Sequence, residues 1–311
     1  MRKFINKLTK AIRSPLGTII TIVGPEKMTF LSDETFIKAV FKFRVGYKIN
    51  LDCPQTYNEK LQWIKLYDRN PRYTAMVDKV QVRDYISKTI GEKYLIPCLG
   101  VWNSEEDINF DELPNQFVLK CNHNSGLGMC ICKDKSKLNI NNVKAELRRG
   151  LNQDYYYHSR EWPYKDVPKK IIGEKFLVDE SGKDLKDYKV MCFNGEPKLI
   201  ELHMGRFTDH QSQDFYDIDW NKTNITQSGL SLYGSSKSVM PKPVTLDEML
   251  KLSKILSQGI PHVRVDWYSI EEKLYFGELT FFDGSGFDPY DNPEDDLLLG
   301  SWIKLPERQL K

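Results

Sequence analysis

The sequence has neither a strong excess of one charge nor a long hydrophobic run. Its 45 lysine and arginine residues almost balance its 43 aspartate and glutamate residues, which leaves a net charge of +2. Proteins dedicated to nucleic-acid binding usually carry a large basic excess, so this balance argues against that class. The apolar stretch LGTIITIVG, residues 16–24, is far shorter than the ~20 residues that a membrane-spanning helix needs. A globular protein is expected.

Zinc-binding and disulfide patterns are absent too. The six cysteines contain no CxxC pair, and the five histidines supply no zinc-finger spacing. Cys130 and Cys132 alternate along an expected strand and therefore face the same side. We interpret the cysteines as free thiols. This predicts a cytoplasmic protein, because a reducing compartment keeps thiols unpaired.

Two common nucleotide-binding motifs are missing around FVLKCNHNSGLG, residues 117–128. The segment lacks the GK[ST] ending of a P-loop and the GxGxxG of a dinucleotide site. It predicts instead a strand, a polar turn and a returning strand, MCICKD. Lys120 lies at the end of the first strand and precedes Asn, Ser and Gly residues whose backbone amides can approach phosphate oxygens. A plain hairpin turn is the alternative interpretation.

Helices are expected before and after these strands. QTYNEKLQWIKLYDRNP, residues 55–71, starts with a capping box formed by Thr56 and Glu59. MVDKVQVRDYISKTIGEKYLIP, residues 76–97, predicts one further helix that ends at Gly91.

The C-terminal half mixes helices with paired strands. A helix is predicted around residues 141–153, and TLDEMLKLSKILSQG predicts another with a capping box of Thr245 and Glu248. Hairpins join the strand-like runs between and after these helices, and no βαβ unit is recognisable. The pattern therefore indicates an α+β fold with antiparallel sheets.

The stretch HVRVDWYSIEEKLYFGELTFFDGSG, residues 262–286, places charges where a hairpin usually buries apolar side chains. Arg264 and Asp266 share one face of the first strand, and Glu278 and Thr280 share one face of the second. A turn at residues 269–273 brings the two carboxylates side by side, where they repel unless a cation lies between them. Mg²⁺ binds such oxygen ligands and completes its shell with phosphates. A solvated face with cross-strand ion pairs is the alternative.

The middle segment IIGEKFLVDESGKDLKDYKV, residues 171–190, has a similar ambiguity. Apolar residues surround Glu174 and Lys175, and Asp187 and Lys189 follow at strand spacing. A short extended piece here can offer backbone N–H and C=O groups to the edge of an adenine. A plain hairpin with a charged face is the other interpretation.

The N-terminal segment MRKFINKLTKAIRS, residues 1–14, has apolar residues at helical spacing with five basic residues around them. It predicts an amphipathic helix, for which two positions are open. In one, residues 1–24 bind peripherally to an anionic membrane surface. In the other, the helix packs on its own domain. No small-residue cleavage site follows the apolar run, so a signal peptide is not expected.

Taken together and in order, these motifs resemble the ATP-grasp superfamily. The similarity is greatest to its TupA-like branch, the teichuronopeptide-biosynthesis type, which occurs among cell-surface polysaccharide functions. The resemblance runs from about Leu51 to Pro306, and residues 1–50 carry little of it. The motifs that carry it are YNEKLQWIKLYDR, DKVQVRDYI, GEKYLIP, LPNQFVLKCNHNSG, REWPYKD, DYKVMCFNGEPKLI, FYDIDW, VRVDWY and FGELTFFDGSG.

The resemblance implies a binding site for ATP. Lys120 matches the lysine that reaches the phosphates under a glycine-rich loop, residues 122–128, which contains Ser125 and Gly126. Lys79 is a further contact that the resemblance suggests. The adenine and the ribose would be held by residues of the middle segment, namely Glu174, Lys175 and Leu177 for adenine and Asp187 for ribose.

The resemblance also implies a magnesium site and a set of cationic catalytic residues. The metal ligands would be Asp266, Glu278 and Thr280. Arg264 matches the arginine that stabilises the transferring phosphoryl group, and Lys189 and Arg206 are similar to cationic groups for the phosphates or the reacting carboxylate. Many ATP-grasp enzymes have Asn where this chain has Thr280. A hydroxyl is a weaker Mg²⁺ ligand than an amide carbonyl, which weakens the expectation of a second metal ion.

The implied architecture is an ATP-grasp fold of antiparallel sheets with a hairpin lid subdomain and flanking helices. We expect a basic amphipathic segment over residues 1–50 and a helical part over 51–115. The lid with its glycine-rich loop would take residues 116–172, and the ATP- and metal-binding subdomain residues 173–311.

The resemblance implies an ATP-dependent carboxylate–amine ligase that acts through an acyl phosphate. It would amidate a uronic acid, or build a peptide-like decoration, in capsule, O-antigen or wall-polysaccharide biosynthesis. Its partners would be a carboxylate-bearing sugar or glycan and an amine. Phosphotransfer to a sugar hydroxyl is one alternative. A glycosyltransferase is another, and its DxD metal motif is approached only by DID at residues 217–219.

The segment DYYYHSREWPY, residues 154–164, is rich in tyrosine. Tyrosine rings can stack on sugar rings, and they can equally pack a lid against the rest of the domain. The sequence leaves both interpretations open.

Overall fold

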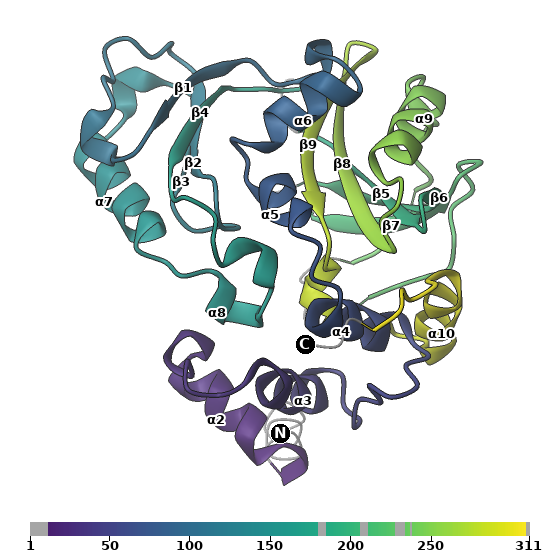
Figure 1. Ribbon diagram of the computed structural model, residues 1–311. Coiled ribbons are helices and arrows are strands. Elements are labelled where there is room, and N and C mark those ends of the chain that lie inside the picture. The colour runs from purple at the N-terminus through teal and green to yellow at the C-terminus, as the bar shows by residue number, and fades with distance from the viewer. Residues whose placement is uncertain (1–11, 180–184, 206–210, 228–233, 237, 309–311) are drawn as a thin grey trace.

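The structure is a computed structural model that describes residues 12–179, 185–205, 211–227, 234–236 and 238–308 (Figure 1). It contains a five-stranded sheet and a four-stranded sheet, with helices around them. All ladders between the named strands are antiparallel, which confirms the predicted α+β class. In Figure 1 the four-stranded sheet lies on the left, the five-stranded sheet on the right, and the first helices at the bottom.

The N-terminal helices are α2 (Pro15–Val23), α3 (Asp33–Arg44) and α4 (Tyr57–Tyr67). α2 is formed by the apolar run of the sequence, and residues 1–11 of the predicted amphipathic helix lie outside the described residues. The predicted capping box of α4 is confirmed, because Thr56 accepts from the Glu59 amide and Glu59 accepts from the Thr56 amide. α4 is therefore fixed at its first turn.

The prediction of one continuous helix from residue 76 to its stop at Gly91 is wrong. The chain forms α5 (Arg72–Val77) and α6 (Val82–Thr89), with a break at Asp78. The Asp78 carboxylate accepts from the Val80 amide at 2.8 Å and from Asn122 Nδ2 at 2.8 Å, so a side chain replaces the helical hydrogen bonds locally. The break places Lys79 against the glycine-rich loop, where its Nζ donates to the Asn124 carbonyl at 2.6 Å.

The five-stranded sheet has the order β7-β6-β5-β8-β9. Its strands are β5 (Asp187–Phe193), β6 (Glu196–Met204), β7 (Ser212–Asp217), β8 (His262–Ile270) and β9 (Lys273–Thr280). Every residue of β5 is buried, as expected for a strand that is covered on both faces. α9 (Leu246–Leu256) packs on β5, β6 and β8.

The predicted capping box of α9 is wrong. No side chain caps the helix: the Thr245 hydroxyl bonds the Ser269 hydroxyl at 2.9 Å, and Glu248 accepts from the Tyr94 hydroxyl at 2.5 Å. Both residues therefore bind neighbouring segments in place of the helix terminus.

The β8–β9 hairpin contains a β-bulge at the centre of the predicted metal site. Arg264 pairs with Thr280 and Val265 with Leu279, but Trp267 already pairs with Phe276, so β9 has one extra residue opposite Asp266. Gly277 lies in this bulge, and a Cβ there would be 3.1 Å from the Asp266 carbonyl oxygen. The bulge keeps Glu278 beside Asp266.

The four-stranded sheet has the order β1-β4-β2-β3. Its strands are β1 (Cys98–Trp102), β2 (Phe117–Cys121), β3 (Met129–Cys132) and β4 (Ile171–Lys175). The sheet packs with α7 (Ile140–Leu151) around a small core of its own. It includes β1, which precedes residue 116, and the lid boundaries at 116 and 172 stay a prediction. Because β4 and β5 belong to different sheets, the plain hairpin considered for residues 171–190 is wrong.

A short helix, α8 (Tyr156–Ser159), lies between the four-stranded sheet and the N-terminal helices α2 and α3 (Figure 1). The Tyr156 hydroxyl donates to Asp33 at 2.5 Å, and Arg160 Nη2 donates to the Met28 carbonyl at 2.6 Å. Part of the tyrosine-rich segment therefore holds the N-terminal helices against the domain. The last helix, α10 (Pro293–Trp302), packs on α4. None of the helices in the described ranges is long and apolar enough to cross a bilayer.

Candidate active site

Charged side chains from three adjacent strands, β5, β8 and β9, meet on one face of the five-stranded sheet. Arg264 Nε donates to Asp266 Oδ1 at 2.7 Å, and its Nη2 donates to Oδ2 at 2.8 Å. Lys189, the β5 neighbour of Asp266, donates to Oδ2 at 2.7 Å. One carboxylate thus holds two cations, through two parallel bonds in the case of the arginine.

These three groups are almost completely removed from solvent, with Asp266 only 3% exposed. Burial alone would raise the pKa of Asp266, but the charges of Arg264 and Lys189 hold it well below its usual range. Burial and Arg264 both act to lower the pKa of Lys189, yet the surrounding carboxylates, first Asp266, raise it overall. All three groups are therefore charged at neutral pH.

Arg264 is the centre of a larger network. Its Nη1 donates to Asp283 and lies 3.8 Å from Glu201 Oε2, while its Nη2 lies 3.8 Å from Glu278 Oε1 and 3.3 Å from the Thr280 hydroxyl. The guanidinium is fixed on every side by oxygen atoms. A planar arginine held in this way is oriented before a phosphoryl group arrives, and it can contact that group by exchanging one of these oxygen partners.

Glu201 and Asp283 were not predicted from the sequence. Glu201 accepts from His203 Nε2 at 2.5 Å and from Gln213 Nε2 at 2.6 Å. Burial acts to raise the pKa of Glu201, but His203 and Arg264 lower it to about 2. Burial and the nearby Glu201 raise the pKa of Asp283 to about 6. A lone acid in the apolar run KLIELHM was the signal that could have drawn attention to Glu201.

A second group of cations comes from β2 of the four-stranded sheet, from α6 and from the break between α5 and α6. Lys120 Nζ is 2.6 Å from Glu174 Oε2, and Arg83 Nη1 is 3.5 Å from Oε1 of the same carboxylate. Lys79 lies in the break between α5 and α6. Burial lowers the pKa of Lys79, and Glu278 opposes this change. In turn the charge of Lys79 lowers the pKa of Glu278 against the effect of burial. Lys79 therefore links the glycine-rich loop, through its bond to the Asn124 carbonyl, with Glu278 of the β8–β9 hairpin.

The glycine-rich loop has a fixed base and an open tip. Asn122 is completely buried; its amide donates to the Lys170 carbonyl at 3.0 Å, and its Oδ1 accepts from the Lys170 amide at 2.7 Å. Gly128 is equally restricted, because a Cβ on it would lie 2.7 Å from Gly150 Cα. Ser125 and Gly126 are exposed, and Gly126 has a φ of +85° with open space where a Cβ would lie. The tip is free to approach a ligand.

The remaining predicted residues lie near these groups or outside the described chain. Lys175 is exposed and its amide donates to the Pro97 carbonyl at 2.9 Å, while Leu177 is half-buried just after β4. Asp187 is buried at the start of β5 and, by strand alternation, lies on the same face as Lys189. Arg206 lies outside the described residues. Their roles toward ATP stay predictions.

The hairpin offers oxygen ligands of the kind that Mg²⁺ prefers. The side chain of Glu278 is 37% exposed, and the Thr280 hydroxyl lies 3.4 Å from its Oε1. Both oxygens of Asp266 already bind cations of the protein. In the described parts of the chain, no group of three or more His, Cys, Asp or Glu residues forms a metal cage. This donor set fits a cation that takes one or two carboxylates and leaves positions for phosphates.

Several solved structures resemble this fold at low sequence identity. D-alanine–D-alanine ligase from Helicobacter pylori is 14% identical, covers 80% of this chain and 69% of its own, and has a TM-score of 0.43. The ATP complex of the Bacillus anthracis D-alanine–D-alanine ligase is 16% identical over 82% of this chain and 64% of its own, with a TM-score of 0.37. The ATP-grasp ligase PsnB with minimal precursor, Mg and ADP is 13% identical over 78% and 65%, with a TM-score of 0.37.

The chain spans between 64% and 69% of the length of these three proteins. No curated protein matched the sequence. A family model, TupA-like ATPgrasp, matches residues 59–304, which is most of the chain and contains every described group of the site. The protein therefore belongs to the TupA-like ATP-grasp family.

Proposed function

We propose that this protein is an ATP-dependent ligase that joins a carboxylate to an amine. In the first step the γ-phosphoryl group of ATP is transferred to a carboxylate oxygen, which gives an acyl phosphate and ADP. In the second step the amine attacks the acyl carbon, the amide bond forms, and phosphate leaves with the bonding electron pair. The observation that carries the proposal is the buried set of Lys189, Arg264 and Asp266 beside Glu278.

The chain's own residues would act by holding charge in place. Arg264 and Lys189 present fixed positive charge, because Asp266 binds both of them within the sheet. Groups that are oriented before the reaction stabilise developing negative charge without paying for reorganisation at that moment. Lys120 and the open tip of the glycine-rich loop would hold the phosphates from the lid side, where Lys120 now binds Glu174.

Magnesium, when bound, would neutralise charge on the phosphates and orient them for in-line transfer. Glu278 and Thr280 would hold it, since the Glu278 side chain is 37% exposed and the Thr280 hydroxyl lies 3.4 Å from its Oε1. Asp266 would contribute an oxygen only if Lys189 or Arg264 moved part of its contact to the nucleotide. This competition gives Asp266 a structural as well as a metal-binding role.

The two substrates besides ATP, the carboxylate and the amine, are proposed from the family resemblance. A TupA-like protein of cell-surface polysaccharide assembly would use a carboxylate-bearing sugar or glycan, such as a uronic acid, and an amine. The products would be an amidated sugar or a peptide-like decoration of a capsule, O-antigen or wall polysaccharide.

Calorimetric titration with a non-hydrolysable ATP analogue, with and without Mg²⁺, tests the ATP site. We expect Mg²⁺-dependent binding by the wild type and at least tenfold weaker binding, about 1.4 kcal/mol, by Glu278→Gln. Glu272→Gln, an exposed carboxylate in the turn of the same hairpin, is the matched control and should bind like the wild type. Binding of the analogue that depends neither on Mg²⁺ nor on Glu278 would contradict the proposed ATP site.

The reaction itself is tested by product mass. The ligase forms an amide from a uronic acid and an amine and releases ADP and phosphate. A phosphorylated sugar would instead indicate phosphotransfer to a hydroxyl, and a new glycosidic bond a glycosyltransferase. Absence of ADP release with every acid and amine pair would count against the ligase.

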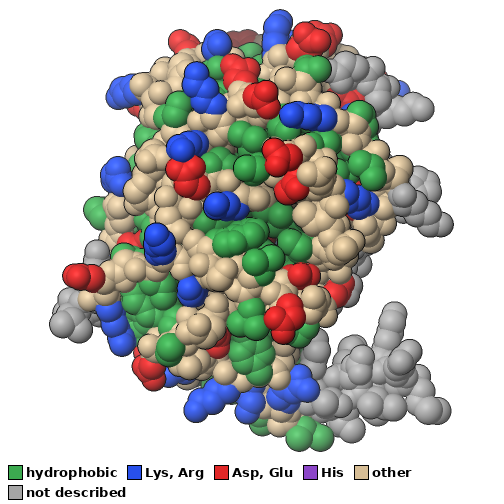
Figure 2. All heavy atoms as spheres, turned by 90° about the vertical axis from the view of Figure 1, so that its right-hand side faces the viewer, with side chains coloured by type: hydrophobic (Ala, Val, Ile, Leu, Met, Phe, Trp, Pro, Cys, Tyr) green, Lys and Arg blue, Asp and Glu red, His purple; other side chains and the backbone are tan. Residues whose placement is uncertain are grey.

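We also propose that α2 contacts an anionic membrane surface. Leu16, Ile19 and Ile22 lie along one exposed side of this helix and are 36%, 51% and 78% exposed. Exposed basic residues occur just before α2, shortly after it, and in or after α3. They are Arg13, Lys27, Lys42 and Lys48. Figure 2 shows basic side chains gathered at the lower end of the molecule, where Figure 1 places α2 and α3. Apolar residues with basic neighbours suit the interface of an anionic bilayer.

A further inference from the structure

A buried lysine, Lys65 of α4, takes no part in the proposed reaction, although it is completely removed from solvent. Its ammonium group donates to two backbone carbonyls, that of Ser285 at 2.7 Å and that of Ser159 at 3.2 Å. The rings of Phe282 and Phe287 lie next to it, with their centroids 5.4 and 4.5 Å from Nζ. Burial lowers the pKa of Lys65 to about 7. Keeping an amine in such a place is unfavourable, so its retention calls for a reason.

A buried carboxylate, Glu161, holds the same two serines by their hydroxyl groups. Its Oε1 accepts from Ser159 Oγ at 2.8 Å and from Ser285 Oγ at 2.6 Å. Each serine therefore gives its carbonyl to Lys65 and its hydroxyl to Glu161. These four residues, the Lys65 cluster, join three segments that are far apart in the sequence, namely α4, the tyrosine-rich segment and the turn after β9.

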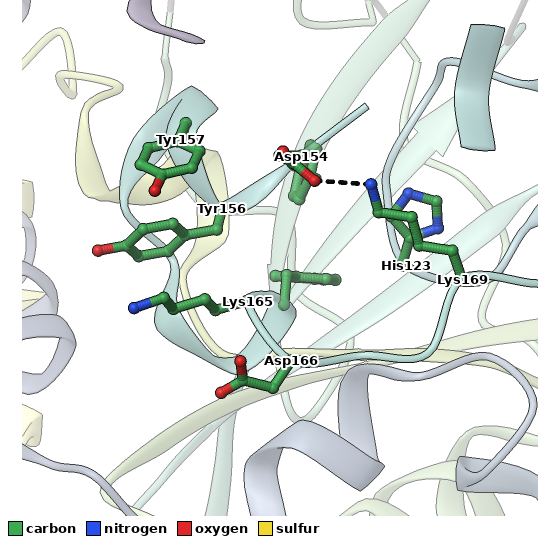
Figure 3. A pocket seen from close by; sticks show the side chains of 9 residues that line it. His123, Asp154, Tyr156, Tyr157, Lys165, Asp166 and Lys169 are labelled. Carbon is green, nitrogen blue, oxygen red and sulfur yellow. Dashed lines mark hydrogen bonds and ion pairs between the residues drawn. The ribbon is translucent and has the colours of Figure 1, made fainter. Parts of the chain in front are cut away.

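The tyrosine-rich segment folds back on itself around Glu161. Tyr155 and Tyr164 pack edge to face with their ring centroids 4.9 Å apart. The Lys165 ammonium group lies 5.3 Å from the centroid of the Tyr156 ring, and Figure 3 shows these two side chains next to each other at a pocket that they help to line. Both contacts join a residue before Glu161 to a residue after it. They close the segment into a loop and limit where the Glu161 carboxylate can lie.

The turn that the Lys65 cluster holds, Asp283–Gly286, has an unusual backbone. Its last three residues have φ angles of +52°, +55° and +65°, and the middle one, Ser285, is not a glycine. Such a residue is strained and persists only where its surroundings enforce the conformation, which occurs most often at functional sites. The enforcement comes from α4, because Gln62 Nε2 donates to the Ser285 carbonyl at 2.9 Å and to the Gly286 carbonyl at 2.6 Å, in addition to the bond from Lys65.

The turn matters to the candidate site because it begins with Asp283. Arg264 Nη1 donates to the Asp283 carboxylate, while Nε and Nη2 of the same guanidinium bind Asp266. One residue separates Asp283 from Ser285, so a turn that is held at Ser285 also limits where the Asp283 carboxylate can lie. The Lys65 cluster is therefore connected to Arg264 through this turn.

We propose that Lys65 and Glu161 are positioning residues for Arg264. They hold the carbonyl and the hydroxyl of Ser285, which keeps the turn in its left-handed conformation and the Asp283 carboxylate against Arg264 Nη1. Both act through the turn and not on the substrates. The proposal rests on the proposed function, in which Arg264 presents fixed positive charge to the transferring phosphoryl group, and it adds two residues that keep this charge in place.

Two-dimensional ¹H–¹⁵N NMR spectra of the arginine Nε–H groups, recorded without nucleotide, test the proposal. The Nε–H of Arg264 is buried and hydrogen-bonded, so it should exchange slowly with water, and its loss in Arg264→Lys assigns the signal. Lys65→Met keeps an unbranched apolar side chain against the two phenylalanines but removes the ammonium group. We expect it to shift the Arg264 signal in the same direction as Asp283→Asn does.

A double variant tests whether Lys65 acts through Asp283. If it does, Lys65→Met should add no further shift of the Arg264 signal in the Asp283→Asn protein. Ser285→Ala removes only the hydroxyl bond to Glu161 and should cause a smaller shift in the same direction. This variant takes the place of Lys65→Met if thermal unfolding shows that Lys65→Met does not fold.

Lys60→Met is the matched control, because Lys60 also lies on α4 and also donates to a backbone carbonyl, that of Ile303 at 2.8 Å. This variant should leave the Arg264 signal in place. The indole N–H of Trp267 serves as an internal reference, since it donates to Ser253 Oγ at 2.9 Å and lies on the opposite face of β8. Its signal should stay unchanged in every variant.

A folded Lys65→Met or Ser285→Ala protein whose Arg264 signal is unchanged would overturn the proposal. The same holds for an equal shift in Lys60→Met, for an equal shift of the Trp267 signal, and for a full additional shift in the double variant. Because the spectra need neither nucleotide nor substrate, a negative ligase assay or absent ATP binding would count against the proposed function and leave this result unaffected.

Discussion

The β8–β9 hairpin and helix α2 depart from the usual distribution of side chains in opposite directions. The hairpin buries charges: Arg264 is 8% exposed and Asp266 3%. α2 exposes apolar side chains: Ile19 is 51% exposed and Ile22 78%. Globular proteins normally bury the second kind and expose the first, and the informative exceptions mark sites of function.

The two exceptions have different energetic consequences. Buried ion pairs offset their desolvation cost only by contacting each other, and apolar replacements of whole pairs are often no less stable. The hairpin network is therefore better explained by what it can bind than by stability. In α2 the packing is done by Gly17 and Ile20, since a Cβ on Gly17 would lie 2.5 Å from the Ala39 carbonyl oxygen. The exposed side of α2 is free to serve another purpose.

Removing the shared carboxylate should produce the largest effect. In Asp266→Asn two buried cations, Arg264 and Lys189, lose the charge that holds them together. Breaking a buried pair in this way costs about 3–5 kcal/mol, which urea unfolding will measure as a lower free energy of unfolding.

Glu278→Gln is the control for that experiment, because its side chain is 37% exposed and its contact with Arg264 is 3.8 Å. It should lower ATP binding with little change in stability. Equal and small stability losses in both variants would mean that the hairpin charges are solvated, and the contrast with α2 would disappear.

The β8–β9 hairpin also buries a neutral histidine, which predicts a pH dependence of stability. His262, the first residue of β8, donates from Nδ1 to the Phe281 carbonyl at 3.1 Å and accepts at Nε2 from the Tyr57 hydroxyl, also 3.1 Å. Burial lowers its pKa from 6.5 to about 4. The unfolded chain therefore binds more protons than the folded chain between these two values, so stability rises with pH across this window.

The full contribution of His262 is about 3 kcal/mol; it is present above pH 6.5 and lost as the pH falls toward 4. Urea unfolding of the wild type and His262→Gln across this window should show that the variant lacks this part of the pH dependence. The difference between the two proteins cancels other titrating groups, such as Asp283. Parallel curves for the two proteins would mean that His262 is protonated in the folded state.

Much of the fold could be predicted from local patterns. The α4 capping box and the strands that flank the glycine-rich loop follow from residues close in the chain. The break at Asp78 could not be predicted, because it depends on Asn122, which lies 44 positions away in the sequence. The absent cap of α9 has the same cause: its polar residues find partners on other segments.

The candidate site shows the same difference between features that local sequence predicts and features that depend on distant residues. The hairpin pattern indicated that Arg264, Asp266 and Glu278 share one place, because alternation and a turn suffice for that inference. Glu201 and Asp283 approach Arg264 only through the packing of β6 and the chain after β9. The ion pair of Lys120 with Glu174 likewise needs the pairing of β2 with β4.

Substitutions on α2 should have the smallest effect on stability and a large effect on membrane binding. Ile19→Ser and Ile22→Ser remove apolar surface that is already exposed, so the free energy of unfolding should change by no more than about 0.5 kcal/mol. Burying one isoleucine in an apolar environment is worth about 1.5–3 kcal/mol. Co-sedimentation with phosphatidylglycerol vesicles should therefore fall at least about tenfold for each substitution.

Val244→Ser tests whether α2 itself is responsible, because Val244 is 75% exposed and lies just before α9. This variant should bind vesicles like the wild type, and added salt should weaken both, since exposed basic residues accompany the apolar side of α2. Wild-type levels of binding by the double variant Ile19→Ser/Ile22→Ser would refute membrane contact through α2. If the double variant instead converted a dimer into a monomer in sedimentation analysis, the apolar side of α2 would be a contact between two copies of the chain, and its exposure would have the ordinary explanation of an interface.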